Sequence, residues 1–192
     1  MERDYTILES EYTVPVEEIL ADCVDVPKFL ALCKACPNYG NRWSCPPYQG
    51  NMYFVWMAYD ELQLVIRMVK PSPGMTEEEA LRMVDRERAA FSAELLRREK
   101  EIPDAMSLAA GPCTKCGDNC ARKTGGICRM PQELRYSIES IGGDVSKLTE
   151  RYFGKSLLWI ENGVLPEYFL LAGGFLKKKD RLNIGSSIYA EP

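Results

Sequence analysis

Four cysteines occur within a stretch of 16 residues in the second half of the chain. They are Cys113, Cys116, Cys120 and Cys128, separated by two, three and seven residues. A two-residue gap lets neighbouring sulfur atoms converge on one ion or on one face of a cluster. Because four thiolates repel one another and resist burial, they need a cation beside them, which zinc or an iron–sulfur cluster supplies. The pattern therefore predicts a metal site.

Three further cysteines, Cys33, Cys36 and Cys45, form a second candidate site nearer the N-terminus. A proline directly follows both Cys36 and Cys45, as in ferredoxin loops, where the ring rigidifies the turn after a ligand. Cys23 lies ten positions before Cys33 and is either a fourth ligand or a small apolar residue packed in the core. Without Cys23, an iron at this site has an open coordination position, which permits ligand binding or catalysis as well as electron transfer.

The spacing of the cysteines also bears on which metal they bind. Zinc proteins usually pair two Cys-x-x-Cys units across a longer gap, whereas each set here has one such unit and uneven spacings elsewhere. We therefore expect iron–sulfur clusters of the 4Fe-4S type, one or two in number, with zinc as the alternative. The Cys-x3-Cys-x2-Cys order of the radical enzymes that use S-adenosylmethionine is absent, so that chemistry is not expected.

The chain contains eight cysteines and no histidine among its 192 residues. The missing histidine excludes Ser–His and Cys–His catalysis, and also zinc sites that mix cysteine with histidine. The N-terminus lacks the pattern of a signal peptide, and no apolar run approaches the roughly 20 residues of a membrane helix. We expect a cytoplasmic protein, in which thiols stay reduced and eight cysteines indicate metal rather than disulfides.

The charge of the chain limits its partners. A net charge of −4, with acidic and basic residues mixed along the sequence, argues against a nucleic-acid partner. We expect no membrane partner, and a redox protein of unknown identity as the partner. The basic residues around the second cysteine set are Lys115, Arg122, Lys123 and Arg129. They either offset the negative charge of a thiolate-ligated cluster, form a docking patch for an acidic redox partner, or are ordinary solvated surface.

Hydrophobic periodicity, caps and turn residues predict an alternation of strands and helices. We expect strands over residues 5–14, 61–69, 105–110, 157–160 and 168–176. We expect helices over residues 16–22, after the cap Asp25, from the capping box Thr76–Glu79 to about Lys100, from Pro131 to Gly142, and from the cap Asp144 to Gly154.

These elements predict an α+β fold, with a mixed or antiparallel sheet and helices packed on one side of it. A ferredoxin-like arrangement is one form of such a fold, with the cysteine-rich metal-binding loops inserted near one end of the sheet. We expect a single cysteine-rich metal-binding domain over residues 1–192. The Ala172-Gly173-Gly174 run lacks the lysine and spacing of a phosphate-binding loop, and we expect it to be a strand bulge.

The residues beside the cysteines resemble a known family. The matching motifs are the segment 33–40, Trp43-Ser44-Cys45-Pro46-Pro47, the run 110–131, and the segment 135–145. Together they resemble the predicted metal-binding proteins called domain-of-unknown-function family 2284, which are cysteine-rich and found largely in anaerobic bacteria and archaea. The resemblance spans about residues 29–176 and implies metal binding, but it implies no particular reaction.

Two positions depart from the family's pattern, namely Tyr136 in place of proline and Gly143 in place of isoleucine. Neither position is a candidate ligand. Cys23 lies outside the motif, so the resemblance does not extend a ligand role to it.

Three functions remain open from the sequence. The first is a redox protein whose clusters pass single electrons to a partner. The second is a structural or regulatory zinc protein in which the metal holds loops to a modest core. The third is an enzyme with an open-site iron–sulfur cluster at Cys33, Cys36 and Cys45. Whether the two cysteine sets bind one metal centre or two is also open.

Overall fold

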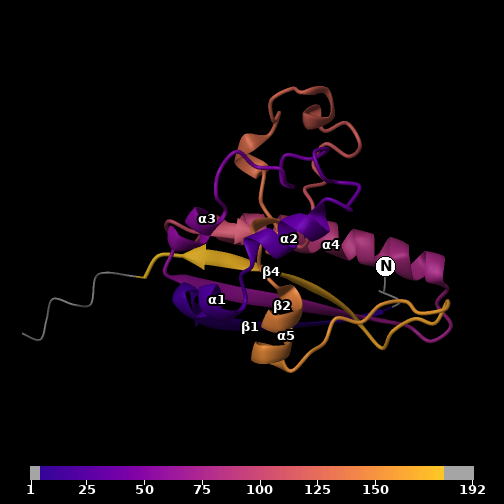
Figure 1. Cartoon of the computed structure of the whole chain (residues 1–192). Helices are drawn as coiled ribbons and strands as arrows, with labels where there is room; N and C mark the ends of the chain where they lie inside the picture. Colours follow the sequence, from indigo (N-terminus) through magenta and orange to yellow (C-terminus); the bar gives the residue numbers. More distant parts are fainter. Residues whose placement is uncertain (1–4, 180–192) are drawn as a thin grey trace, which may run out of the picture.

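A four-stranded antiparallel sheet runs through the middle of the structure, a computed structural model that describes residues 5–179 (Figure 1). The strands lie in the order β1 (Tyr5–Pro15), β2 (Glu61–Pro71), β4 (Phe169–Lys177) and β3 (Met106–Leu108). Helices pack on this sheet, so the expected α+β fold with an antiparallel sheet is confirmed. The expectation of one domain over residues 1–192 extends beyond the described residues at both ends.

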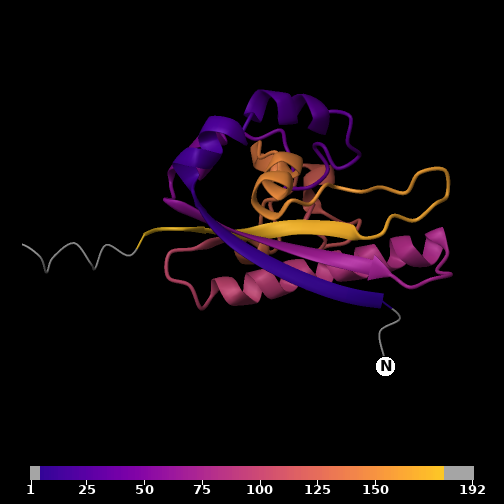
Figure 2. The same ribbon diagram turned by 90° about the horizontal axis from the view of Figure 1, so that it is seen from below.

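Helices cover both faces of the sheet rather than one (Figure 2). The helix α4 (Glu77–Glu99) packs on one face. The helices on the opposite face are α1 (Val16–Asp22), α2 (Val26–Cys33), α3 (Tyr53–Met57) and α5 (Val145–Phe153). No helix among residues 5–179 is both long and apolar enough to cross a membrane.

The expectation of helices on a single side is wrong because β2 is apolar on both of its faces. Leu64 and Ile66 point into the core shared with α1 and α5, whereas Val65 and Val69 point into the core shared with α4. Successive side chains of a strand point to opposite faces, so a continuous apolar run requires a cover on each side.

The elements β2, α4 and β3 form a split strand–helix–strand unit. Both strands are antiparallel to β4, which lies between them, so β2 and β3 run parallel to each other. Such a unit is typical of ferredoxin-like folds. The arrangement departs from the helices-on-one-side form we expected, and β1, the first strand of the chain, pairs along the other edge of β2.

The helix caps expected from the sequence are present. Thr76 and Glu79 form the capping box of α4, with each side chain accepting a hydrogen bond from the other residue's backbone amide. Asp144 caps α5 by accepting a hydrogen bond from the amide of Lys147 at 3.1 Å. The same carboxylate accepts a hydrogen bond from Nζ of Lys28 in α2 at 3.0 Å, so one side chain holds two helices together.

The helix expected from Pro131 to Gly142 is wrong. The segment forms two 3₁₀ turns, η2 (Pro131–Glu133) and η3 (Glu139–Ile141), with non-helical backbone between them. The amide of Ala109 donates a hydrogen bond to the carbonyl of Tyr136 at 2.8 Å. This pairing continues the sheet edge beyond β3 and holds the segment out of a helix, which overrides the helical spacing of its apolar residues.

Of two other expected strands, one is only partly present and the other is wrong. The strand expected over residues 105–110 is limited to β3, and residues 157–160 form no strand. Leu157 and Ile160 pack against the two cores through their side chains without pairing their backbone to the sheet. Apolar side chains alone therefore account for the strand-like pattern of this segment.

Both cysteine segments rise from one side of the layered core and stand beside each other (Figure 1). The first segment follows α2, and the second follows β3, so elements far apart in the sequence bring them together. Hydrogen bonds between the two segments, described below, fix their relative position.

The glycine pair in β4 allows a close approach rather than forming a bulge. The register between β2 and β4 is continuous, with Gly173 opposite Val65 and Gly174 opposite Leu64. A Cβ atom on Gly173 would lie 2.5 Å from the carbonyl oxygen of Leu108 and 2.6 Å from Cδ1 of Leu95. Glycine at this position therefore lets β3 and α4 pack directly against β4.

We predict that Gly173→Ala destabilises the protein by about 2 kcal/mol, because overpacking against a backbone oxygen forces the strands apart. Urea unfolding at neutral pH measures the change. The matched control is Gly50→Ala, whose added Cβ would meet only Cε of Met52 at 3.9 Å and should change stability by less than about 0.5 kcal/mol. Equal stability of the two variants would contradict the packing described here.

Candidate metal centre

The first group of thiols is assembled by the end of α2 and a closed loop. Cys33 is the last residue of α2, and the amide of Cys36 donates a hydrogen bond to its carbonyl at 2.9 Å. The chain returns through Gly40, whose amide donates to the carbonyl of Pro46 at 2.8 Å. Gly40 has a φ of 69°, which favours glycine, so this turn brings Cys45 back towards the two earlier cysteines.

Two of these thiols, Cys36 and Cys45, act electrostatically on the third. Burial raises the pKa of the Cys33 thiol, and Cys36, Cys45 and Glu139 raise it further. Burial also raises the pKa of Cys45, with Arg42 and Arg122 opposing the rise. Thiols that raise one another's pKa in this way need a nearby cation to stay together as thiolates.

The second group is built from a series of tight turns. The amides of Gly117 and Asn119 donate to the carbonyls of Thr114 and Cys116 at 2.9 and 3.0 Å, respectively. A 3₁₀ helix, η1 (Ala121–Thr124), then separates Cys120 from Cys128. Every cysteine of this group is partly exposed, so none of these residues belongs to the hydrophobic core.

The four thiols of the second group also act on one another. Burial raises the pKa of Cys113, the backbone amide of Lys115 opposes this, and Cys116, Cys128 and Cys120 each raise it further. The influences on Cys33 and Cys113 thus come from different sets of thiols. The two cysteine segments therefore contain two groups, one of three thiols and one of four.

Cys23 lies apart from both groups. It is the C-cap of α1, only 2% exposed, and belongs to the hydrophobic core. Burial raises the pKa of its thiol, and its other electrostatic neighbours are Arg151, Lys147 and Asp22. This position favours the interpretation of Cys23 as a packed core residue.

Two arginines join the cysteine segments to each other. Arg122 of the second segment donates hydrogen bonds to the carbonyls of Arg42, Cys45 and Pro47 in the first. In the reverse direction, Arg42 donates to the carbonyls of Cys113 and Gly117 at 3.2 and 2.7 Å. Each guanidinium therefore satisfies backbone groups of the opposite loop while adding positive charge beside the thiols.

Ser44 and Trp43 complete this connection. Ser44 is 1% exposed, and its Oγ accepts a hydrogen bond from the amide of Cys113 at 2.9 Å while lying 3.8 Å from Sγ of Cys45. Nε1 of Trp43 donates to the carbonyl of Gly126 at 3.0 Å. The guanidinium of Arg122 stacks over the Trp43 ring, with its Cζ 5.0 Å from the ring centroid. A single buried hydroxyl thus links a residue of each thiol group.

The charge of the two segments suits thiolates. Residues 33–50 and 111–130 contain six basic side chains and one acidic side chain, although the whole chain has a net charge of −4. Arg42 and Arg122 bind backbone carbonyls, and Lys115 pairs with Glu133 at 2.7 Å. The concentration of positive charge at this end of the molecule offsets part of the charge of seven clustered sulfur atoms.

Neither group of cysteines forms a ready-made metal site. Across residues 5–179, no three Cys, Asp or Glu side chains lie close enough to hold one metal ion. The donor chemistry nevertheless fits a metal, because seven thiols in two groups are surrounded by cations and backbone amides. Binding would draw the sulfurs of a group together around the metal.

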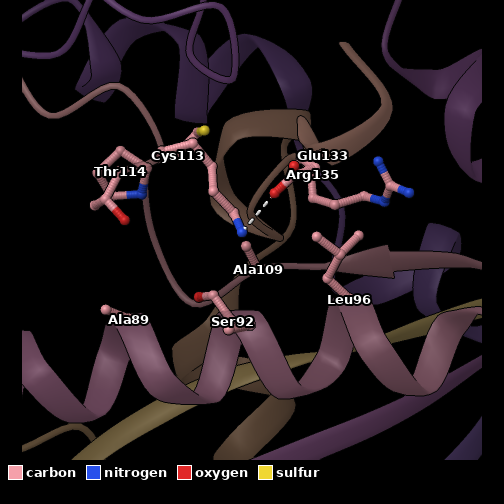
Figure 3. Close-up of a pocket in the computed structure, with 11 residues that line it drawn as sticks. Ala89, Ser92, Leu96, Ala109, Cys113, Thr114, Glu133 and Arg135 are labelled. Atoms are coloured by element: carbon pink, nitrogen blue, oxygen red, sulfur yellow. Dashed lines mark ion pairs between the residues drawn. The ribbon is translucent and has the colours of Figure 1, made fainter. Parts of the chain in front are cut away.

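A cavity of about 210 Å³ lies between α4 and the second cysteine segment (Figure 3). Ala89, Ser92 and Leu96 of α4 form one wall, and Cys113 and Thr114 face them. The sulfur of Cys113 points away from α4, so this cavity borders the backbone of the thiol group rather than its sulfur atoms.

A second cavity, of about 230 Å³, has mainly apolar walls and two charged residues, Arg88 and Glu139. Glu139 is partly exposed as a residue, but its Oε2 is buried and, within residues 5–179, has no hydrogen-bond partner. Burial raises the pKa of its carboxyl group. Hydrogen bonds to this carboxyl group from its own backbone and from the Ser137 side chain oppose the rise in pKa, as does the charge of Arg88.

Sequence reasoning missed Arg42 and Ser44 as site residues. Both lie in or beside the motifs of the family resemblance, but no spacing rule identifies a lone arginine or serine as part of a metal site. Their roles come from contacts with residues about 70 positions away in the sequence.

Comparison with known proteins agrees with this description. The family described as "Predicted metal-binding protein (DUF2284)" matches residues 18–169. The chain therefore belongs to this family, and it is a predicted metal-binding protein of α+β fold. No curated protein and no solved structure matches the chain.

We predict that Arg122→Ala loosens the first cysteine segment, because three backbone carbonyls lose their donor. Limited trypsin digestion of the metal-free protein should cleave after Lys34 at least about tenfold faster than in the wild type. Arg129→Ala is the matched control, because Arg129 is exposed on the same segment, and its cleavage rate should stay unchanged. Equal rates for the two variants would rule out the bridging role.

Glu99, the last residue of α4, holds both ends of the second cysteine segment. Its carboxylate accepts hydrogen bonds from the amide and hydroxyl of Ser107 at 2.7 and 2.6 Å, and from the guanidinium of Arg135. Burial alone would raise the pKa of Glu99, but the donors of Arg135 and Ser107 outweigh burial and lower it.

We predict that Glu99→Gln destabilises the metal-free protein by about 2 kcal/mol at pH 7. Because the folded-state pKa is lowered, the contribution of the carboxylate is complete above the unfolded pKa of about 4.3 and is lost as the pH falls through the folded value. Urea unfolding should therefore show a smaller difference between variant and wild type at pH 3. Glu101→Gln, in an exposed pair with Arg97, should cost less than about 0.5 kcal/mol at either pH.

Proposed function

We propose that this protein binds two iron–sulfur clusters of the 4Fe-4S type and transfers single electrons to a partner protein. Cys33, Cys36 and Cys45 would hold one cluster, and Cys113, Cys116, Cys120 and Cys128 would hold the other. The observation that carries the proposal is the placement of seven accessible or half-buried thiols on two segments, three on one and four on the other, that hydrogen bonds join. The clusters would supply one-electron redox chemistry.

The arrangement of donors supports clusters over a single ion such as zinc. A tetrahedral zinc ion needs its ligands to converge on one point. In a four-iron cluster, each thiolate binds a different iron, so the sulfurs remain farther apart. The uneven spacings of the cysteines within residues 33–45 and 113–128, with one Cys-x-x-Cys unit in each, suit the larger group better.

The connection between the segments supports a joint redox role. The Ser44 hydroxyl accepts a hydrogen bond from the amide of Cys113 and lies 3.8 Å from the sulfur of Cys45. Arg122 donates a hydrogen bond to the carbonyl of Cys45. Two centres held by segments that share hydrogen bonds lie in one rigid unit. Rigid placement limits the reorganisation that accompanies a change of charge at either centre.

The surface around the thiols supports an acidic partner. Lys34, Lys123 and Arg129 are exposed beside the cysteines. Leu32 and Ile127, which directly precede Cys33 and Cys128, are 59% and 85% exposed. Exposed aliphatic side chains on segments that also carry exposed positive charge suit a transient complex with an acidic redox protein, and we propose that this complex forms in the cytoplasm.

The proposal predicts about eight iron and eight sulfide atoms per chain after purification without oxygen. Cys45→Ala should remove the first cluster and Cys120→Ala the second, so that each variant keeps about half of the iron and sulfide. Cys23→Ala is the control and should keep both clusters, because Cys23 lies in the core. Metal and sulfide assays, together with electron paramagnetic resonance of the reduced protein, measure these outcomes.

Stoichiometric zinc without sulfide would overturn the proposal in favour of a structural or regulatory zinc protein. Loss of all iron in both single variants would instead indicate one centre shared by the two segments. Bound clusters that no acidic electron carrier can reduce or oxidise would leave the third function, an enzyme with an open-site cluster, as the better account.

A further inference from the structure

The strand β1 has one long edge that no other strand covers. In the sheet order β1-β2-β4-β3, β1 lies outermost, and within residues 5–179 it pairs only with β2. It lies on the side of the sheet away from the two cysteine segments (Figure 1). A free edge of this kind presents backbone N–H and C=O groups that can pair with a strand of another chain. The inference that follows concerns this edge and goes beyond the proposed metal binding.

The edge is long and regular. The register with β2 is unbroken over 11 residues, from Tyr5 opposite Pro71 to Pro15 opposite Glu61, so no bulge turns the edge away. Folded proteins usually protect such edges with bulges, prolines, lysines or very short strands. β1 contains no lysine, and its one proline is its last residue. Since residues 8–13 are all exposed, the edge is open to pairing.

The two acidic side chains of β1 are already bound within the chain. Glu9 forms an ion pair with Arg67, and Glu11 forms one with Arg98 of α4 at 2.7 Å. Nε2 of Gln63 also donates a hydrogen bond to the carboxylate of Glu11 at 2.6 Å. These contacts balance the negative charge, so they lower the repulsion that the strand would offer to a second acidic edge.

The opposite face of β1 carries exposed apolar side chains. Leu8 and Tyr12 are 45% and 48% exposed, and they share a face with Val14, because side chains two and four positions apart in a strand point the same way. The ring of Tyr152 in α5 stacks on Tyr12, with the two ring centroids 5.0 Å apart, so Tyr12 is held in place. Ser10 lies between the two apolar residues on this face.

This pattern is complementary to itself. When two copies of β1 pair antiparallel about a twofold axis at Ser10, Leu8 of each chain lies opposite Tyr12 of the other. Cross-strand neighbours of this kind bury apolar surface from both side chains. Glu9 then faces Glu11 of the second chain, and each is balanced by its own arginine. A shift of two residues in either direction would break both Leu–Tyr pairs and would place Glu9 or Glu11 opposite its own copy.

We propose that two copies of this chain associate through β1, antiparallel and centred on Ser10, so that their four-stranded sheets join into one continuous sheet. The contact is narrow, and we expect a reversible dimer with a dissociation constant on the order of 10 μM. Because the cysteine segments lie away from this edge, the dimer leaves both candidate metal centres uncovered (Figure 1).

The competing explanation is that β1 is a solvated edge that Glu9 and Glu11 keep apart from other chains. A charge placed at Ser10 separates the two explanations. Ser10 is exposed, so a longer side chain is compatible with the fold of one chain. On a twofold axis, the same side chain meets its own copy, so its effect on association is large.

The test measures the mass in solution of the whole 192-residue chain, with reductant present so that no disulfide links two chains. Sedimentation from about 1 to 500 μM should show a monomer that converts to a dimer. In Ser10→Lys, two ammonium groups would face each other on the axis, and we expect association at least about tenfold weaker. An equimolar mixture of Ser10→Lys and Ser10→Glu should restore the dimer, because opposite charges then meet.

Ser146→Lys is the matched control, because Ser146 is an exposed serine near the start of α5, and it should associate as the wild type does. Amide hydrogen exchange gives an independent measurement. In the wild type, residues 5–15 should exchange more slowly at high than at low protein concentration, and this dependence should be absent in Ser10→Lys. Exchange in the rest of the chain checks that each variant folds.

Two outcomes would overturn the dimer through β1, namely a wild type that stays monomeric over the whole concentration range, or a dimer that Ser10→Lys leaves unchanged. A mixture of the two charged variants that fails to associate would overturn the register centred on Ser10.

Discussion

Seven thiol groups repel one another once they ionise, and this repulsion constrains how the two cysteine segments can fold. Positively charged side chains, and hydrogen bonds between side chains and the backbone of the opposite segment, counter this repulsion. Arg42 and Arg122 bind carbonyls of the opposite segment, and Ser44 joins Cys113 to the surroundings of Cys45. The same contacts that place the thiols thus offset their charge, so a change in either arginine alters both the geometry and the electrostatics of the site.

The sheet and its covering helices fix where the two cysteine segments begin. α2 ends at Cys33, and the polypeptide leaves β3 only a few residues before Cys113, so rigid elements define where each group begins. Glu99 connects α4 to Ser107 and Arg135 on either side of the second segment. Irregular loops rich in glycine and proline can therefore carry a defined arrangement of side chains, because their ends are anchored to packed secondary structure.

The two groups differ in their number of thiols, and this difference affects the chemistry that each could support. A group of four thiols is complete in itself, whereas a group of three depends on another donor. This difference would separate a centre that can bind an added ligand from one that only relays electrons.

Local signals in the sequence determined the strands β1 and β2 and the caps of α4 and α5, because each of these depends on residues close together in the chain. The spacing of the cysteines also indicated the candidate metal ligands. The motif resemblance likewise indicated the metal-binding family that matches residues 18–169. Tertiary structure decided the rest. The covering of both sheet faces, the extended path before η3, and the roles of Ser44 and Arg122 all arise from contacts between distant parts of the chain. Such contacts depend on how whole elements pack, and no local pattern of residues records them.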